Sequence, residues 1–148
     1  MKPGSTIRIG STIVLEGSIF YNNLIQVIMK KILVYDDDID ILGICATILK
    51  FKGFDVLCRD NCKELIKDVE SYRPDVILMD NWLPDIGGVK AIQLLKKTEH
   101  LKSIPVIFFS ANSQVEELAK EAGADYMLIK PFELDDLEKI IVTAVHQH

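Results

Sequence analysis

From Lys30 to His146 the chain alternates short apolar runs with longer segments of helical periodicity, and this alternation constrains the fold most strongly. Parallel strands need long crossovers, which are right-handed and place helices on both faces of one sheet. The sequence therefore predicts an α/β, doubly wound (βα)5 parallel sheet. The expected strands are 32–35, 54–58, 75–80, 104–110 and 126–129, and the expected helices are 39–51, 61–72, 89–97, 113–122 and 133–146.

The third expected strand carries the strongest single signal. Four consecutive apolar residues, Val76-Ile77-Leu78-Met79, lie between Asp75 and Asp80, and a turn at Pro84 follows. An uninterrupted run rich in branched side chains is typical of a strand buried on both faces. Ligands of open parallel sheets gather at the carboxyl ends of the strands. Asp80 ends this strand, so its carboxylate is placed for chemistry.

Composition bounds the function classes. The 148 residues are 49% hydrophobic and 26% charged, which is typical of one globular domain with a real core. The net charge of −5 argues against nucleic acid as a partner, because neutralising phosphates needs a basic face. The chain has three cysteines, Cys45, Cys58 and Cys62. Their odd number and the absence of paired metal-ligand spacing favour reduced thiols and a cytoplasmic location.

Residues 1–28 differ from the rest in their glycines, hydroxyl residues and low charge. Short strands are expected at Thr6–Ile9 and Thr12–Leu15, and a short helix at Phe20–Met29. The apolar stretch that begins at Ile13 is interrupted by polar residues and is too polar to cross a membrane. Because Met29-Lys30-Lys31 resembles a protein start, we expect 1–28 to be a dispensable extension and 29–148 to be the domain. The alternative is an element that covers a surface or mediates assembly.

Polar residues follow four of the five expected strands. In a sheet with the order 2-1-3-4-5, the first and third strands are neighbours, so Asp36, Asp37 and Asp80 would share one crevice. Like charges this close raise one another's pKa unless a cation intervenes, and oxygen ligands suit Mg²⁺. Ser110 and Lys130 add a hydroxyl and a positive charge from the fourth and fifth strands. Together these groups can hold a phosphoryl group on a carboxylate.

Four segments, in this order and spacing, carry a specific resemblance. From Met29 to His148 the chain resembles a receiver domain of a two-component response regulator, similar to chemotaxis regulators with the flavodoxin-like order 2-1-3-4-5. The segments are Lys31-Ile32-Leu33-Val34-Tyr35-Asp36-Asp37-Asp38, Met79-Asp80-Asn81-Trp82-Leu83-Pro84, Phe109-Ser110-Ala111 and Lys130-Pro131-Phe132.

The resemblance implies a phosphorylation site that depends on Mg²⁺. Asp80 would be the phosphoacceptor. Asp36 and Asp37 would position Mg²⁺, with Asp37 the more direct ligand, and the backbone carbonyl of Trp82 would also bind the metal. The Trp82 indole lies two residues after Asp80, where we expect it to obstruct attacking water and to slow hydrolysis of the aspartyl phosphate.

The resemblance also implies a switch. Ser110 would be the switch hydroxyl, Lys130 would contact the phosphate, and the Lys130-Pro131 bond would be cis. The family usually has an aromatic residue three positions before the lysine, where this chain has Met127, so the usual coupling of hydroxyl and aromatic ring is altered. The turn that usually reads Asp-Gly here reads Gly87-Gly88, a change expected to affect only loop stiffness.

The implied function is signalling. The phosphoryl group would come from the phosphohistidine of a partner histidine kinase or histidine phosphotransfer protein. Phosphorylation would shift the surface formed by the fourth helix, fifth strand and fifth helix, which a downstream effector protein would read. We expect no turnover on external substrates and no output domain after the fifth helix, so the signal would pass to another protein.

Two alternatives stay open. A haloacid-dehalogenase-like phosphatase would use Asp36 as nucleophile and Asp38 as acid/base, but it leaves Asp80 without a role. A pseudo-receiver would act as an interaction module without being phosphorylated. Incubation with a small phosphodonor and Mg²⁺ separates the three readings: label on Asp80, label on Asp36, or no label.

Overall fold

The computed structural model describes residues 6–9, 12–15 and 29–147. The first two segments are β1 (Thr6–Ile9) and β2 (Thr12–Leu15), which pair antiparallel with Thr6 opposite Leu15. The two strands expected there are confirmed. The helix expected over 20–29 falls almost wholly outside the described residues.

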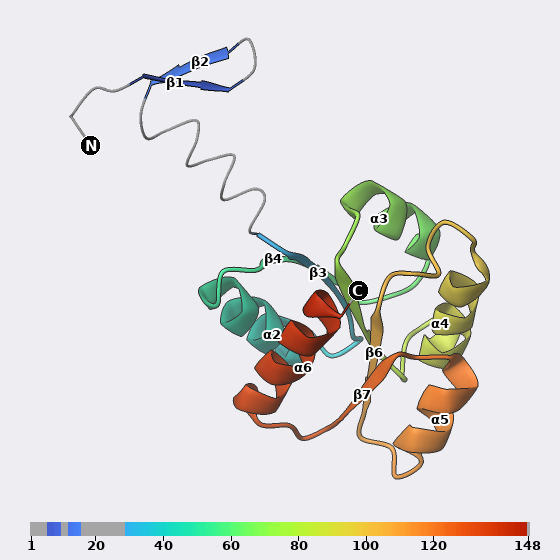
Figure 1. The fold of residues 1–148 in the computed structure, drawn as a ribbon. Helices are drawn as coiled ribbons and strands as arrows, with labels where there is room; N and C mark the ends of the chain where they lie inside the picture. The colour runs from blue at the N-terminus through green and yellow to red at the C-terminus, as the bar shows by residue number, and fades with distance from the viewer. Residues whose placement is uncertain (1–5, 10–11, 16–28, 148) are drawn as a thin grey trace.

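The central feature is a parallel five-stranded sheet in the order β4-β3-β5-β6-β7 (Figure 1). With β3 counted as the first strand, this is the predicted flavodoxin-like order 2-1-3-4-5. The observed bounds of these five strands differ from the expected ones by two residues at most. The strands are β3 (Lys31–Tyr35), β4 (Asp55–Arg59), β5 (Val76–Asp80), β6 (Val106–Ser110) and β7 (Tyr126–Ile129).

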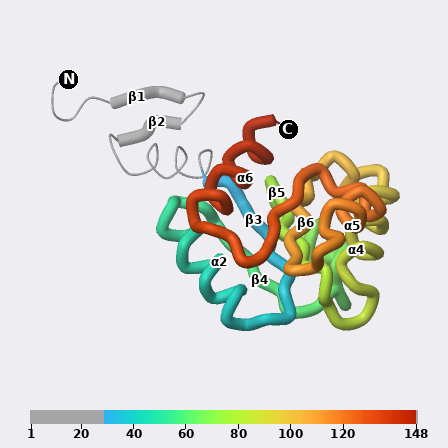
Figure 2. Tube along the Cα trace, turned by 90° about the horizontal axis from the view of Figure 1, so that it is seen from below, coloured from blue at the N-terminus to red at the C-terminus, as the bar shows by residue number. Residues whose placement is uncertain are grey.

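Helices cover both faces of this sheet (Figures 1 and 2). α2 and α6 pack on one face, and α3, α4 and α5 pack on the other. No helix of the described segments is long and apolar enough to cross a membrane. The helices are α2 (Ile39–Phe51), α3 (Leu65–Tyr72), α4 (Gly87–Lys97), α5 (Val115–Ala122) and α6 (Leu134–His146).

Strand β5 lies in the middle of the sheet, and all of its residues are buried. Ile77 and Met79 point into the core on the side of α3, α4 and α5, whereas Val76 and Leu78 point into the core on the side of α2 and α6. Side chains alternate between the faces of a strand, so a strand with helices on both sides must be apolar at every position. This explains the continuous apolar run before Asp80.

Local side-chain chemistry explains where two of the helices begin. The Asp38 carboxylate caps α2 by accepting hydrogen bonds from the backbone N–H groups of Asp40 and Ile41 at 2.9 and 3.3 Å. The expectation that the next helix begins at Asn61 is wrong, because α3 begins at Leu65. The Asn61 side chain instead accepts the Lys63 N–H at 3.0 Å in a local turn, which delays the start of the helix.

Candidate functional site

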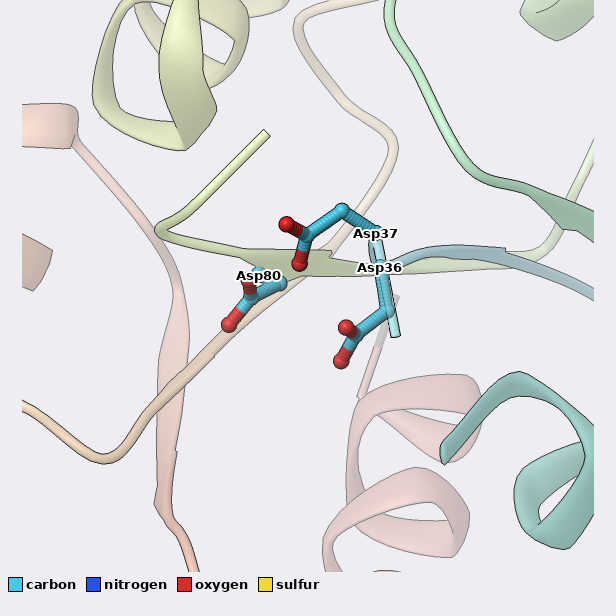
Figure 3. Close-up of side chains that lie close together, drawn as sticks. All are labelled: Asp36, Asp37 and Asp80. Atoms are coloured by element: carbon cyan, nitrogen blue, oxygen red, sulfur yellow. The ribbon is translucent and has the colours of Figure 1, made fainter. Parts of the chain in front are cut away.

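Three carboxylates meet at the carboxyl edge of the sheet (Figure 3). Asp36 and Asp37 directly follow β3, and Asp80 is the last residue of β5. Because β3 and β5 are paired neighbours, their ends bring these side chains together. One oxygen from each carboxylate lies within 4.8 Å of the other two. Asp36 and Asp80 are buried, at 0% and 3% exposure, whereas Asp37 is exposed.

Lys130 joins the two buried carboxylates. It directly follows β7, and its ammonium Nζ lies 2.6 Å from Asp36 Oδ2 and 3.0 Å from Asp80 Oδ1. Its backbone N–H donates to the Ser110 carbonyl at 3.0 Å, which holds the lysine at the end of β6. The Lys130–Pro131 bond is cis, as the resemblance implied. The edge of the sheet therefore carries a charge-assisted network that links three strand ends.

Backbone groups orient the same carboxylates. The second oxygen of Asp80, Oδ2, accepts the Trp82 N–H at 2.9 Å, and Asp36 Oδ1 accepts the Asp38 N–H at 2.8 Å. Each buried carboxylate thus has one oxygen on the lysine and one on the backbone. Both are held in place before any ligand arrives.

The charges at this edge do not balance, since one ammonium faces three carboxylates. Burial raises the pKa of Asp80 above its ordinary value, and the charge of Asp36 adds to this rise; the hydrogen bond and charge of Lys130 oppose it without cancelling it. Burial lowers the pKa of Lys130, but its hydrogen bonds to Asp36 and Asp80 outweigh this effect, so the pKa is raised overall. The site therefore favours a further cation.

The donor set fits Mg²⁺. The grouped atoms are carboxylate oxygens, the ligands that this hard cation prefers, and exposed Asp37 leaves one side open to water. A divalent cation would offset the excess negative charge. The predicted metal ligands Asp36, Asp37 and Asp80 therefore lie together, and the role of the Trp82 carbonyl stays a prediction.

Ser110 lies at the same edge. It is the last residue of β6, and the residue before it, Phe109, is the register partner of Asp80. Its side chain is fully buried, and its Oγ accepts the Asn112 N–H at 3.1 Å. A hydroxyl that accepts one hydrogen bond keeps its own proton to donate. The structure thus holds a donor at the end of the strand next to β5.

The family model for the response regulator receiver domain matches residues 32–142. This chain belongs to the response regulator receiver domain family. The match includes every residue predicted for the site, from Asp36 to Lys130.

Relatives of this receiver domain occur in larger signalling proteins. It is 32% identical over 111 residues to the CAI-1 autoinducer sensor kinase/phosphatase CqsS of Vibrio cholerae, and 35% identical over 109 residues to the transcriptional regulatory protein PrrA of Mycobacterium tuberculosis. These matches cover 73% and 72% of this chain but only 16% and 46% of the relatives. The chain therefore spans less than half of the length of either relative.

A solved structure supports the same fold. The response regulator receiver domain protein (CheY-like) from Methanospirillum hungatei JF-1 superposes with a TM-score of 0.72 at 26% identity. The superposition covers 80% of this chain and 95% of that one.

Gly88 of this receiver domain lies against the backbone of Asp80, a contact that the sequence does not predict. A Cβ at this position would lie 2.0 Å from the Asp80 carbonyl oxygen and 2.9 Å from Asn81 Cα. Its N–H donates to the Asn81 carbonyl at 3.0 Å. α4 therefore begins in direct contact with the backbone of Asp80. The departure from the usual Asp-Gly lies at Gly87, and its expected effect on loop stiffness alone stays a prediction. The glycine pair after the turn at Pro84 and Asp85 marks this position in the sequence, but it does not reveal the contact.

Two further predicted residues lie around the site. The Trp82 side chain is 68% exposed, although its backbone N–H is bonded to Asp80.

Met127 is 38% exposed and lies opposite Phe108 in the register of β6 and β7. Tyr126 packs on the side of α2 and α6 and donates its hydroxyl to Gln147 Oε1 at 2.8 Å. Neighbouring residues of a strand point to opposite faces, so Met127 points to the side of α5.

Proposed function

We propose that this receiver domain accepts a phosphoryl group on Asp80, with Mg²⁺ bound by Asp36, Asp37, Asp80 and the Trp82 carbonyl. One observation carries the proposal: a buried carboxylate at the end of the central strand shares a lysine with a second buried carboxylate and lies beside a third. A purely structural ion pair needs one carboxylate for each ammonium. The excess of acids is suited to a site that takes up a cation and an anionic group.

The chemistry follows from the positions of the side chains. An oxygen of Asp80 forms the new bond to phosphorus while the bond between phosphorus and the donor breaks, and the donor leaves with the electron pair. Lys130 stays near the new phosphoryl oxygens as a positive charge, and Ser110 donates its hydroxyl to one of them. Mg²⁺, when bound, would neutralise part of the negative charge on the phosphoryl oxygens. Turnover on external substrates is not part of the proposal.

The proposed donor is the phosphohistidine of a histidine kinase or of a histidine phosphotransfer protein. The proposed reader is a downstream effector protein that binds the surface of α5, β7 and α6, with Ser110 and Met127 as switch residues. The similarity to a sensor kinase and to a transcriptional regulatory protein supports a role in two-component signalling. We further propose that the domain acts in the cytoplasm and that residues 1–28 are an extension outside it.

The phosphatase alternative is disfavoured by the surroundings of its proposed acid/base. It requires Asp38 as acid/base, yet the Asp38 carboxylate caps α2. Asp36 and Asp80 are both buried, and each is bonded to Lys130 and to a backbone N–H, so these contacts do not separate the two possible nucleophiles.

The test is incubation with acetyl phosphate and Mg²⁺, followed by intact mass spectrometry. We expect the wild-type chain to gain the mass of one phosphoryl group, and we expect EDTA to abolish the gain. Asp80→Asn should gain nothing, whereas Asp60→Asn, which removes an acid away from the grouped carboxylates, should behave as wild type. No gain in the wild type, under any donor, would support the pseudo-receiver instead.

A further inference from the structure

The ammonium of Lys130 has a third neighbour besides the two carboxylates. Its Nζ lies 4.4 Å from the centroid of the Phe109 ring. Phe109 is fully buried in β6, and the Lys130 side chain is 16% exposed. An ammonium over an aromatic face is attracted by the negative potential of that face, and the attraction is stronger where water is largely excluded.

The ring of Phe109 is itself fixed. It packs in the core on the side of α2 and α6, and the Phe132 ring lies against it at 6.4 Å between centroids with a tilt of 58°. Tilted pairs at this separation are a favourable aromatic arrangement. Phe132 follows Lys130 by two residues. The segment 130–132 therefore contacts the Phe109 ring through two side chains, the Lys130 ammonium and the Phe132 ring.

The ring and the proposed phosphoacceptor come from adjacent strands, since Phe109 and Asp80 are register partners. When a cation or a phosphoryl group binds, the surroundings of Asp36 and Asp80 change. The electrostatic attraction between their carboxylates and the Lys130 ammonium then changes as well. The ring does not change its charge. It is thus a constant contact on a side chain with a flexible four-carbon stem.

We propose that Phe109 is a positioning residue. Its ring holds the Lys130 ammonium beside Asp80, so that the ammonium is already in place when the phosphoryl group arrives. This inference rests on the proposed function for its effect on phosphoryl transfer. The position of the ammonium over the ring does not rest on it and can be measured separately.

The chain offers a matched control in Phe108. It is the neighbouring residue in β6, equally buried, and it points into the opposite core. Phe108→Leu and Phe109→Leu therefore remove the same ring from equally buried positions. We expect the second-order rate constant with acetyl phosphate to fall about five- to tenfold in Phe109→Leu and less than about twofold in Phe108→Leu. Equal losses in the two variants would overturn the proposal.

A second series does not depend on the leucine variants folding. Phenylalanines with one, two or three ring fluorines keep the ring nearly unchanged in shape but weaken the negative potential of its face. At position 109 the rate constant should fall stepwise with each fluorine, whereas at position 108 it should stay constant. A flat series at 109 in a phosphorylated protein would overturn this inference and leave the proposed function standing.

Nuclear magnetic resonance tests the same contact without phosphoryl transfer. Protons beside the Lys130 Nζ should be shifted upfield by the ring current in the wild type and in Phe108→Leu, and this shift should disappear in Phe109→Leu. Absence of the shift in the wild type would overturn the inference. Its presence in a chain that takes no phosphoryl group would refute the proposed function alone.

Discussion

Replacing Gly88 by alanine should damage this domain far more than a glycine-to-alanine change normally does. The new Cβ would lie 2.0 Å from the Asp80 carbonyl oxygen, and ordinary contact begins near 3.4 Å. The first turn of α4 must therefore retreat by about 1.4 Å, or the end of β5 must move by the same amount. Neither shift is free, because Ala91, Ile92 and Leu95 of α4 are almost completely buried.

The size of the loss follows from these contacts. Overpacking of a tight site costs about 1–3 kcal/mol. The retreat also weakens the hydrogen bond from the Gly88 N–H to the Asn81 carbonyl, which adds about 1 kcal/mol. Gly88→Ala should thus lower the free energy of unfolding by about 2–4 kcal/mol. The control is Gly43→Ala in α2, where a Cβ meets nothing within 4 Å. Because alanine has the higher helix propensity, this change should raise the free energy of unfolding by about 0.5–1 kcal/mol.

Urea unfolding followed by circular dichroism measures both variants on the same scale. The order of stability should be Gly43→Ala above the wild type and Gly88→Ala well below it. Because the displaced atoms include the backbone of Asp80, Mg²⁺ affinity should also fall in Gly88→Ala and stay constant in Gly43→Ala. If Gly88→Ala proved as stable as Gly43→Ala, the close approach of α4 to Asp80 would be refuted.

Three further predictions concern single features. Trp82→Asn should shorten the lifetime of the phosphorylated protein after donor removal, because the exposed indole no longer hinders water; an unchanged or longer lifetime would contradict this. Arg59→Met should lower the free energy of unfolding by about 1–3 kcal/mol in urea titrations, because the mostly buried Asp68 carboxylate loses its bidentate hydrogen bonds to the guanidinium. An unchanged free energy of unfolding would contradict this. Burial raises the pKa of the Cys45 and Cys62 thiols from about 9 to about 12, so the unfolded chain releases these protons first and stability should fall between pH 9 and pH 12. Thermal melts of the wild type and of the double alanine variant at both pH values check this, and the variant should show the smaller fall.

Much of the fold was predictable because its signals are local and repeated. A continuous apolar run such as Val76–Met79 is typical of a strand buried on both faces. The parallel topology then brings the acids, the hydroxyl and the lysine at the strand ends to one edge of the sheet. Asp36, Asp37, Asp80 and Lys130 were therefore expected in one place before their distances were known. Their assigned roles remain predictions until phosphorylation is measured.

What the sequence could not predict depends on contacts in three dimensions. The late start of α3 reflects one side-chain turn at Asn61, which competes with a cap that the residue type also permits. The need for glycine at position 88 reflects the approach of two backbones, and a sequence pattern does not contain that distance. The position of Phe109 under Lys130 depends on the sheet register, which joins residues from separate strands.

The central claim is that Asp80 is the residue that carries the phosphoryl group. Borohydride reduction of the protein after incubation with acetyl phosphate and Mg²⁺ converts a phosphorylated aspartate into homoserine, which peptide mass spectrometry can place in the chain. We predict homoserine at position 80 in the wild type and at no position in Asp80→Asn. Homoserine at position 36 with an unmodified Asp80 would contradict the account.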